Sequence, residues 1–471
     1  MFYLCSMEQI ITQIQEYLWT YLLIGVLIGC AIWFSVRTKF VQFTMFGEMC
    51  RLLTDSNETH DKGMKHISSF QAFAVGVATR VGTGNLAGVA IAISIGGAGA
   101  IFWMWLIALL GAATAFVEST LAQLYKTQGK HSFVGGPAYY IKMGLHKPWM
   151  GALFAVLLTI TFGLTNNSVQ ANTICSAMDK AFGWSPVIVG VIMTALALTI
   201  VFGGIHRIAK VSSLLVPIMA IGYVVLALVI LIMKYDLIPD MFAQIFRDAF
   251  GWTQAGGGTL GAIVMTGIKR GLFSNEAGEG SAPNAAATAS VSHPVKQGLI
   301  QALGVFTDTL LICSCTAFII LLSGIYTQSA EDGIALTQSA LQSEIGPSGT
   351  IFVAIAILFF AFSSIIGNYY YGEANVLYLT RKRSVLQGYR ILSGGVMVMF
   401  GALASLELVW SIGDLFMALL TAVNLTAIIL LGKYAFRLLD DYRKQKKAGI
   451  KDPVFHKSQM PEIAEDIECW E

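Results

Sequence analysis

An apolar segment from Phe70 to Ile95 is interrupted at its middle by the sequence Gly82-Thr83-Gly84-Asn85. The segment has the length of a membrane-crossing helix, because about 20 apolar residues cross the hydrocarbon core of a bilayer. Lipid cannot satisfy the backbone N–H and C=O groups that a break sets free, so such a break persists only where it lines a protein cavity or holds a ligand. The interruption therefore predicts a binding site inside a membrane protein.

The rest of the chain supports a polytopic membrane protein, since 55% of its residues are hydrophobic and only 12% are charged. Apolar segments of membrane-crossing length recur along nearly the whole sequence. We expect an all-α fold with about 11 transmembrane helices. They lie near Leu18 to Phe34 and near 70–96, 98–124, 149–177, 186–204, 209–233, 242–272, 297–324, 348–379, 391–406 and 409–432.

The distribution of basic residues predicts the orientation, because cytoplasmic loops carry an excess of Lys and Arg. With the N-terminus outside, the inner loops and tail hold 26 of the 30 basic residues, Lys269 and Arg270 among them. The C-terminus is then cytoplasmic. The first span is expected to remain as a helix, because the acidic Glu8 and Glu16, and no basic residues, precede it. We expect the basic tail to lie beside anionic lipid and not to bind nucleic acid.

A second interruption follows five spans after the first, at Gly256-Gly257-Gly258-Thr259. Paired glycine-interrupted helices at corresponding positions of two halves are typical of inverted-repeat transporters, which bind substrate and ion at the midplane. A single glycine cluster would be explained equally well by close helix packing, and the matched spacing favours the functional interpretation. The pattern predicts a leading helix in residues 1–66, five-helix repeats in 67–234 and 235–433, and a basic cytoplasmic tail in 434–471.

Two other function classes fit the sequence less well. A membrane enzyme would need a nucleophile, a metal cluster or a catalytic base pair, and no such motif stands out; the seven cysteines are scattered. A channel would need a continuous polar or carbonyl-lined pore, usually built by several subunits. Broken helices in both halves suit a carrier better, so we expect no enzyme activity and no cofactor.

Several runs of residues resemble those of the sodium:alanine (alanine/glycine:cation) symporter family. They are Gly82-Thr83-Gly84-Asn85-Leu86-Ala87-Gly88, Gly96-Gly97-Ala98-Gly99-Ala100-Ile101-Phe102-Trp103, Gly135-Gly136-Pro137-Ala138-Tyr139-Tyr140 and Phe273-Ser274-Asn275-Glu276-Ala277-Gly278. The resemblance covers most of the chain. It implies a neurotransmitter-symporter-like fold and sodium-coupled uptake of a small neutral amino acid of the alanine/glycine class by alternating access. A proton-coupled carrier, or one for a larger or more polar amino acid, is the alternative.

The breaks suggest how an amino acid would be held. Free amides of Gly82, Thr83 and Gly84, with Asn85 and the half-helix that follows, can receive a carboxylate at a positive helix end. The substrate ammonium needs acceptors, which the carbonyls near Gly256 and Gly257, with Thr259, can supply. Gln170 can add a side-chain amide, although polar residues in spans also serve merely to join helices.

The resemblance also implies a sodium site. By analogy with the symporter fold, carbonyls of Ala78 and Val81 and hydroxyls of Ser363 and Ser364 would be its ligands, and hard oxygens are what such a cation prefers. The competing interpretation is that both hydroxyls bond only to their own helix. Arg80, two residues before the break, is expected either to face the cavity or to pair with Glu118 or Glu373.

One departure from the family concerns the substrate. Many members have Gly-Trp before the run Tyr-Tyr-Gly-Glu, whereas this chain has Gly367-Asn368 before Tyr369-Tyr370-Tyr371-Gly372-Glu373. Asn368 would leave more volume in the pocket and add a hydrogen-bonding amide. The expected partners are therefore a small amino acid, sodium and the lipid bilayer of the cell membrane, with the identity of the amino acid and the oligomeric state left open.

Overall fold

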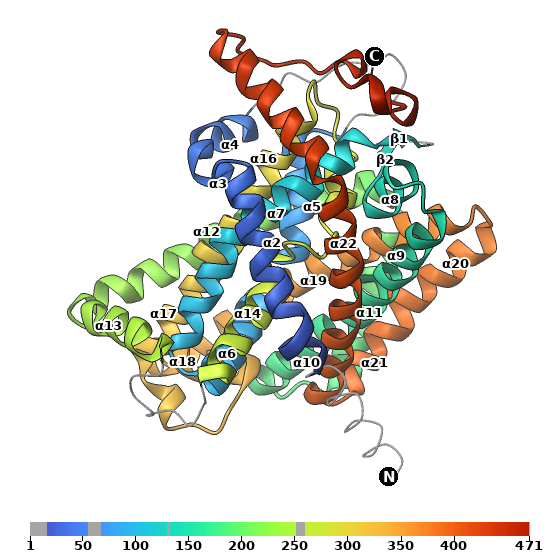
Figure 1. Cartoon of the computed structure of the whole chain (residues 1–471). Coiled ribbons are helices and arrows are strands. Elements are labelled where there is room, and N and C mark those ends of the chain that lie inside the picture. Colours follow the sequence, from blue (N-terminus) through green and yellow to red (C-terminus); the bar gives the residue numbers. More distant parts are fainter. Residues whose placement is uncertain (1–16, 55–66, 130–131, 251–259, 471) are drawn as a thin grey trace.

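Nearly all regular structure in the chain is helical (Figure 1). The computed structural model describes residues 17–54, 67–129, 132–250 and 260–470. The helices of the first half are α2 (Ile24–Arg37), α3 (Val41–Thr44), α4 (Phe46–Leu53), α5 (Ser69–Arg80), α6 (Val89–Gly96), α7 (Gly99–Leu124), α8 (Pro137–Gly144), α9 (Pro148–Ile160), α10 (Asn167–Phe182), α11 (Pro186–Val201), α12 (Gly204–Met233) and α13 (Ile238–Ala249). One small hairpin, β1 (Thr127–Gln128) and β2 (Phe133–Val134), lies between α7 and α8.

The helices of the second half continue to the end of the described chain. They are α14 (Leu260–Asn275), α15 (Pro283–Ala286), α16 (Pro294–Val305), α17 (Ser314–Ser323), α18 (Gly333–Ile345), α19 (Pro347–Leu379), α20 (Arg383–Ile391), α21 (Met397–Leu403) and α22 (Leu406–Lys447). Five π-helical turns precede or join some of these helices: Leu18–Leu23, Gly84–Gly88, Thr161–Asn166, Phe306–Cys313 and Leu392–Val396. A π-helical turn changes the direction in which the following side chains point, and such turns are frequent at functional sites.

Six helical segments of the described chain are long and apolar enough to cross a membrane. They are Gly99–Leu124, Pro148–Phe182, Ile205–Met233, Pro294–Ser323, Pro347–Leu379 and Leu406–Lys447. A seventh span is formed if α5 and the segment Gly84–Gly96 are taken together, and these two are bent by 48° at the break between them. The all-α polytopic fold is thus as expected, although the described helices do not establish a count of eleven spans.

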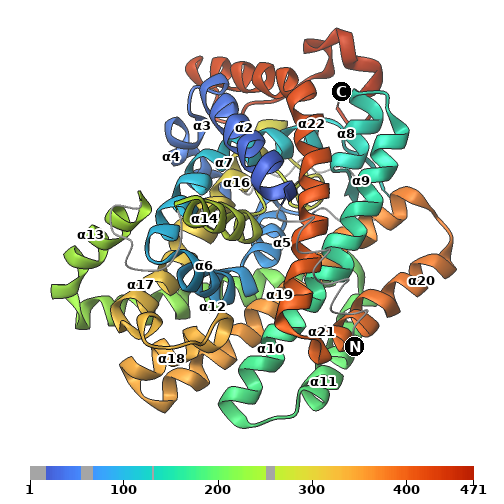
Figure 2. The ribbon, with the colours of Figure 1, turned by 60° about the horizontal axis from the view of Figure 1, so that its bottom comes forward.

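The expected span 242–272 falls on two separate helices, and its predicted break at 256–259 lies outside the described residues. Residues 238–249 form α13, which lies at the side of the bundle in both ribbon views, whereas α14 lies among the central helices (Figures 1 and 2). Helix α13 buries Met241, Ile245 and Ala249 on one face and carries Asp240 and Arg247 elsewhere. Such a one-sided helix packs along a surface, so its apolar residues were wrongly assigned to a membrane span.

The break that follows α14 comes after Asn275. Glu276, Gly278 and Gly280 all have positive φ, at 58°, 98° and 79°, and the chain becomes helical again only in the four-residue α15. Conformations of this kind are unfavourable for most residues, and glycine supplies them at little cost. Residues 276–282 are therefore an irregular segment inside the bundle.

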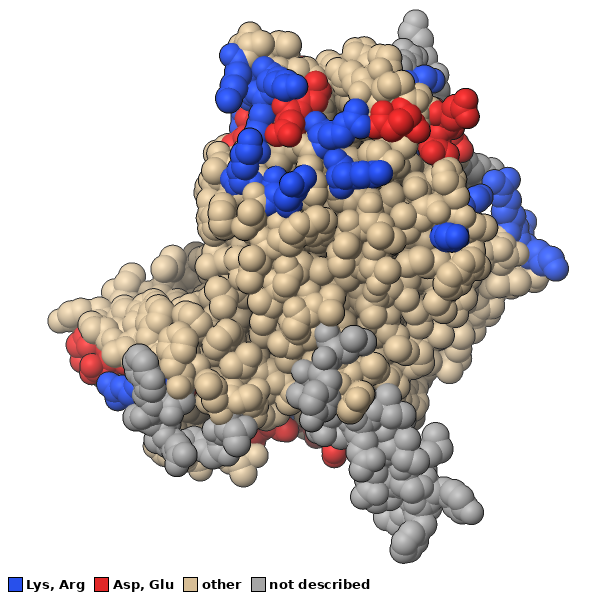
Figure 3. Space-filling view, in the orientation of Figure 1, with Lys and Arg blue, Asp and Glu red and all other residues tan. Residues whose placement is uncertain are grey.

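Charge divides the molecule into two ends and a middle band (Figure 3). Lys and Arg gather over the end where α3, α4 and the C-terminal part of α22 lie, and the broad middle of this face carries almost no charge. We call this end, with α4, α8 and residues 448–470, the basic end. Helix α22 runs from the opposite end to the basic end (Figure 1).

Candidate functional site

The backbone between α5 and α6 leaves several hydrogen-bonding groups of the helix without their usual partners. In an unbroken helix, Gly82 N–H would donate to Ala78 and Thr83 N–H to Thr79. Here Gly82 N–H donates to Asn85 Oδ1 at 2.8 Å, and Thr83 N–H donates to Gln170 Oε1 of α10 at 2.9 Å. The two N–H groups thus donate to side-chain oxygens and not to backbone carbonyls. The carbonyl of Ala78 therefore no longer accepts the hydrogen bond from Gly82 N–H.

The released carbonyl lies against α19. Ser364 Oγ is 2.9 Å from Ala78 O, 3.4 Å from Val81 O and 3.1 Å from Phe360 O, and Ser363 Oγ is 2.8 Å from Phe360 O. Three carbonyls and two hydroxyls therefore form one buried cluster of oxygens. Uncharged hard oxygens of this kind are suitable ligands for a cation such as sodium. The carbonyl of Phe360 had no signal in the sequence, because any residue type offers it.

Gly82 allows α10, α19 and the break to meet. A Cβ atom at this position would overlap Ser364 Oγ and would lie 2.7 Å from Gln170 Oε1. The side chain of Gln170, which is 3% exposed, thus lies where the sequence places a substrate carboxylate. Its amide oxygen accepts from the same N–H group that a carboxylate would use, so a carboxylate bound at Thr83 N would take the place of this oxygen.

Asn85 connects the first break to α14 and to the span that contains α16 and α17. Its Nδ2 donates to Asp308 Oδ1 at 2.6 Å, while Oδ2 of the same carboxylate accepts from Ser274 at 2.8 Å and from Thr309 at 2.7 Å. All four side chains are buried. Three hydrogen bonds satisfy this carboxyl group, as a buried polar group requires. Asp308 and Ser274 are thus close to the predicted site, and only the resemblance of the run beginning at Phe273 pointed to this region.

The irregular segment 276–282 is held by a carboxylate from a distant part of the chain. Glu118 of α7 accepts from Gly278 N–H at 3.3 Å, from Gly280 N–H at 3.2 Å and from Asn424 at 2.8 Å. Glu276 accepts from Thr79 of α5 at 3.3 Å. The two irregular segments of the bundle are therefore joined through buried side chains, and the backbone amides exposed by the second one are satisfied by Glu118.

Arg80 neither pairs with Glu373 nor forms a direct ion pair with Glu118 among the described contacts. Its Nη1 donates to the carbonyl of Gln301 at 3.2 Å and to Oε1 of that residue at 3.4 Å. Glu373 instead forms an ion pair with Arg390 at 2.7 Å. The expected pairing with Glu373 is therefore wrong, because the guanidinium extends toward α16, where Gly304 leaves room for it.

Helix α19 presents one face to α5. Ser364 contacts Ala78, Gly367 lies against Thr79, and Tyr371 OH is 3.2 Å from Thr79 Oγ1. Asn368 is four residues after Ser364 and so lies on the same face. It is 1% exposed, and its Oδ1 has no hydrogen-bond partner within the described part of the protein. An unsatisfied acceptor at this depth is costly unless a ligand or water donates to it.

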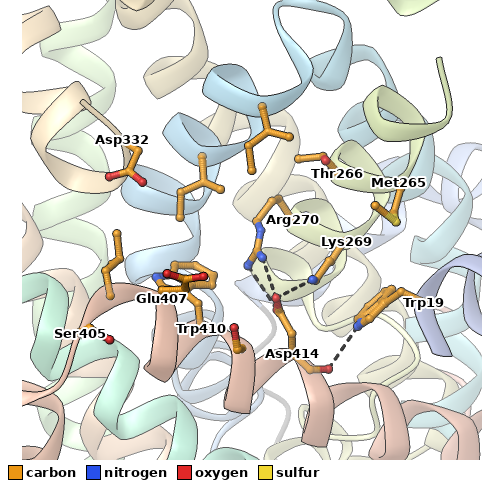
Figure 4. A pocket seen from close by; sticks show the side chains of 14 residues that line it. Trp19, Met265, Thr266, Lys269, Arg270, Asp332, Ser405, Glu407, Trp410 and Asp414 are labelled. Atoms are coloured by element: carbon orange, nitrogen blue, oxygen red, sulfur yellow. Dashed lines mark hydrogen bonds and ion pairs between the residues drawn. The ribbon is translucent and has the colours of Figure 1, made fainter. Parts of the chain in front are cut away.

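A cavity of about 620 Å³ is lined by residues at the start of α22 (Figure 4), which lies at the end opposite to the basic end (Figure 1). It lies between α6, α14 and the start of α22. On one side, Asp414 accepts from Lys269 and Arg270, both at 2.7 Å. The Arg270 guanidinium is 4.4 Å from the centre of the Trp410 ring, which in turn packs on Phe273 with centroids 4.5 Å apart. These residues form a layer between the cavity and Ser274 of the buried cluster.

One expectation from the sequence needs correction at this cavity. Lys269 and Arg270 were counted among the basic residues of inner loops, whereas both line the cavity together with Ser405 and Glu407 at the start of α22. Both belong to α14 and form ion pairs with Asp414, which lies inside α22, so their charges say nothing about a loop.

The predicted site residues fall into two groups. The structure brings together Ala78, Val81, Gly82, Thr83, Gln170, Ser363 and Ser364 through the contacts above, and Asn85 joins them through Gly82. Gly84 also lies at this point, since a Cβ there would be 3.1 Å from Ser274 Cα. Gly256, Gly257 and Thr259 lie outside the described residues. The irregular backbone that the structure describes in this half is at 276–282.

Comparison with known proteins gives a consistent result. The model of the sodium:alanine symporter family matches residues 4–457. A protein named "Probable sodium/glutamine symporter GlnT" from Bacillus subtilis is 51% identical, over 98% of this chain and 96% of that protein. The "Amino-acid carrier protein AlsT" of the same organism is 48% identical, over 97% and 96%. The "Sodium/alanine symporter AgcS" of Methanococcus maripaludis is 35% identical, over 90% and 94%.

Solved structures share the fold at low sequence identity. The crystal structure of MhsT in complex with L-phenylalanine has a TM-score of 0.55 and 15% identity, covering 80% of this chain and 96% of that one. A mutant of the Eremococcus coleocola manganese transporter has a TM-score of 0.55 and 13% identity, covering 82% and 88%. At such identities the likeness concerns the fold alone, and it confirms the expected fold class.

Proposed function

From the chain's membership of the sodium:alanine symporter family, we propose that it is a sodium-coupled carrier of a neutral amino acid with a polar side chain, of the glutamine type. Members of the family are transporters and not enzymes. The observation that carries the proposal is the junction at Gly82, where the freed carbonyl of Ala78, the hydroxyl of Ser364 and the amide of Gln170 meet. Cation and amino acid would bind on adjacent sides of this single turn of backbone.

The five oxygens around Ser364 would hold sodium, and the amides of Gly82 and Thr83 would hold the substrate carboxylate. The substrate would displace the amide oxygen of Gln170, which could then donate its own N–H groups to the carboxylate after rotation. Because both ligands use one short stretch of backbone, sodium binding would order the amides that receive the amino acid. Such mutual ordering gives each ligand a higher affinity in the presence of the other.

Asn368 supports a polar substrate over alanine. Its Oδ1 is a buried acceptor without a donor in the described structure, and the carboxamide of glutamine ends in an NH2 group that could donate to it. The methyl group of alanine could not, and the acceptor would stay unsatisfied at a cost of about 1–3 kcal/mol. The 51% identity to a protein named as a probable sodium/glutamine symporter supports the same choice.

Replacing Asn368 with tryptophan is expected to reverse this preference. The indole fills the volume and removes the acceptor, so glutamine should compete at least about tenfold less well for uptake while alanine competes as well or better. The measurement is inhibition of labelled uptake by a panel of unlabelled amino acids, in both proteins. Ile355→Trp, at a position of the same helix that is 45% exposed, controls for bulk on α19 and should leave the selectivity unchanged. Identical selectivity profiles would exclude Asn368 from the pocket.

The proposed function is tested by uptake into vesicles that contain the purified chain. Labelled L-glutamine should accumulate when a sodium gradient is imposed, and a proton gradient alone should not drive it. Saturation with rising substrate would distinguish a carrier from a channel. If neither glutamine nor alanine accumulates with sodium, the proposed function is wrong; if only alanine does, the substrate assignment alone fails.

We further propose that the basic end faces the cytoplasm, since Lys and Arg gather there (Figure 3). Alkaline phosphatase fused after residue 471 should then be inactive, and a fluorescent protein fused at the same point should fluoresce. Active phosphatase at this position would show that the C-terminus, and with it the basic end, lies outside the cytoplasm.

A further inference from the structure

Residues 448–470, which follow α22, fold back across the basic end and bury a regular set of side chains. Phe455 and Ile467 are each 3% exposed, Ile463 is 5% exposed and Trp470 is 6% exposed, whereas Val454, directly before Phe455, is 43% exposed. A tail that served only to place positive charge beside lipid would have no need to bury aromatic and aliphatic residues. The basic tail was expected to lie beside lipid. Residues 448–470 in addition pack against the rest of the protein.

The tail contacts the connection between α15 and α16. Ser292 Oγ donates to Pro453 O at 2.8 Å, and Phe455 N–H donates to Ser292 O at 2.9 Å, so two short extended segments lie side by side. The Phe455 ring packs on His293, with centroids 5.8 Å apart. Lys296, at the start of α16, forms an ion pair with Asp452. The tail therefore holds the residues that connect α15 to α16, which follow the irregular segment 276–282.

A second set of contacts holds the same connection from the other side. Trp470 Nε1 donates to Gln123 O at the end of α7, and the Trp470 ring lies under Lys126 Nζ at 4.5 Å. Gln123 and Lys126 in turn donate to Ala289 O, at 2.9 and 3.3 Å. Ser290 N–H donates to Ile67 O at 3.2 Å, directly before α5 begins. A chain of contacts thus connects the tail to the residues directly before α5 and to those that follow α15.

The structure is closed at this end. Residues 72–80 of α5 and all residues from 282 to 296 are buried, while the cavity of about 620 Å³ lies away from the basic end. A carrier that works by alternating access must at some point open the closed side by moving one set of helices against another. Opening of the basic end would have to separate α5 and the segment 287–293 from their neighbours, and the tail spans that seam.

We propose that residues 448–470 form a strap that holds the basic end closed, and that the strap must release from Ser292 and Gln123 before the substrate can leave on that side. The strap sets the balance between the closed and the open states of this end, without contacting the substrate. The inference goes beyond the proposed function and requires only that the chain transports by alternating access.

A reversible cross-link tests the strap directly. Ser292→Cys and Pro453→Cys together place one thiol on each of two residues that the structure brings into contact through the hydrogen bond from Ser292 Oγ to Pro453 O, in a chain whose Cys5, Cys50 and Cys469 are replaced by Ser. After oxidation, sodium-driven uptake of labelled L-glutamine and L-alanine should fall at least about tenfold and should recover with dithiothreitol. Equilibrium binding of the same amino acids should be retained. Full uptake by a completely cross-linked protein would overturn the proposal. The variants that carry only Ser292→Cys or only Pro453→Cys serve as controls, because neither can form the cross-link.

A pair of neighbouring variants tests the opposite change. Phe455→Ala removes a buried ring, and Val454→Ala removes an exposed side chain from the adjacent position. In Phe455→Ala, hydrogen exchange across 286–293 and the first turn of α5 should be about tenfold faster, because the closed state is less populated. Val454→Ala should exchange as the parent does. Equal exchange rates in the two variants would overturn the strap, even if the chain transported neither amino acid, so this outcome is separate from failure of the proposed function.

Discussion

Gly82→Ala is expected to weaken sodium-dependent amino-acid binding by about tenfold or more while leaving the protein folded. The added Cβ would overlap Ser364 Oγ and approach Gln170 Oε1 to 2.7 Å. Both atoms are ends of side chains that can move, so the fold can accept the change. The movement removes Ser364 from the carbonyls of Ala78 and Val81, and Gln170 from Thr83. Overpacking of this kind costs about 1–3 kcal/mol, which corresponds to roughly a 5- to 150-fold loss of affinity for either ligand alone.

The matched control is Gly222→Ala in α12. A Cβ there meets nothing within 4 Å, and alanine favours a helix over glycine, so this variant should bind and transport as the parent does. Thermal unfolding in detergent checks that both variants fold. Unchanged binding of labelled amino acid to a well-folded Gly82→Ala protein would show that the junction at Gly82 is not part of the binding site.

Ser364→Ala is expected to raise the sodium concentration for half-maximal uptake by about tenfold or more. The hydroxyl lies within 3.4 Å of three carbonyls, and its loss leaves these oxygens with one partner fewer, at a cost of about 1–3 kcal/mol. Because the binding of sodium and of the amino acid are linked, the affinity for the amino acid at a fixed sodium concentration should fall as well. Initial uptake rates across a sodium titration give both quantities.

Two further serines of α19 calibrate this result. Ser363→Ala should act in the same direction with a smaller effect, because within the described part of the chain Ser363 Oγ hydrogen-bonds only to the Phe360 carbonyl. Ser348→Ala, at the exposed start of the helix, should have none. A sodium dependence that is the same in Ser364→Ala and Ser348→Ala would exclude Ser364 as a ligand.

The first break could be predicted from the sequence because its signal is local. Gly82 and Gly84 interrupt an apolar run that otherwise has the length of a span, and the cost of free backbone groups in lipid gives the interruption a meaning. What the freed groups contact is not local. Ser364 lies 286 residues from Ala78, and only the resemblance to a family placed the two together.

The irregular segment after α14 was missed for a related reason. The run Gly256-Gly257-Gly258 is the more conspicuous glycine cluster, and the apolar residues of α13 before it suggested a span. The glycines at 278 and 280 are accompanied by Glu276 and Glu279, which look unsuited to membrane depth. The irregular backbone is tolerated because Glu118, 160 residues before Gly278, accepts from the amides of Gly278 and Gly280. A stabilising partner so far away in the chain leaves no mark on the local sequence.

The strap also has a consequence for how the protein is made. Residues 448–470 are synthesised after every helix that they contact, and chains acquire structure in the order in which they are synthesised. Both irregular helices and their neighbours therefore enter the membrane before the segment that closes the basic end exists. A chain cut off after α22 would therefore contain every helix of the bundle but not the segment that holds the basic end closed, and its balance would shift toward the open state of that end. The last residues to be synthesised would thus set the balance between the two states of the finished protein.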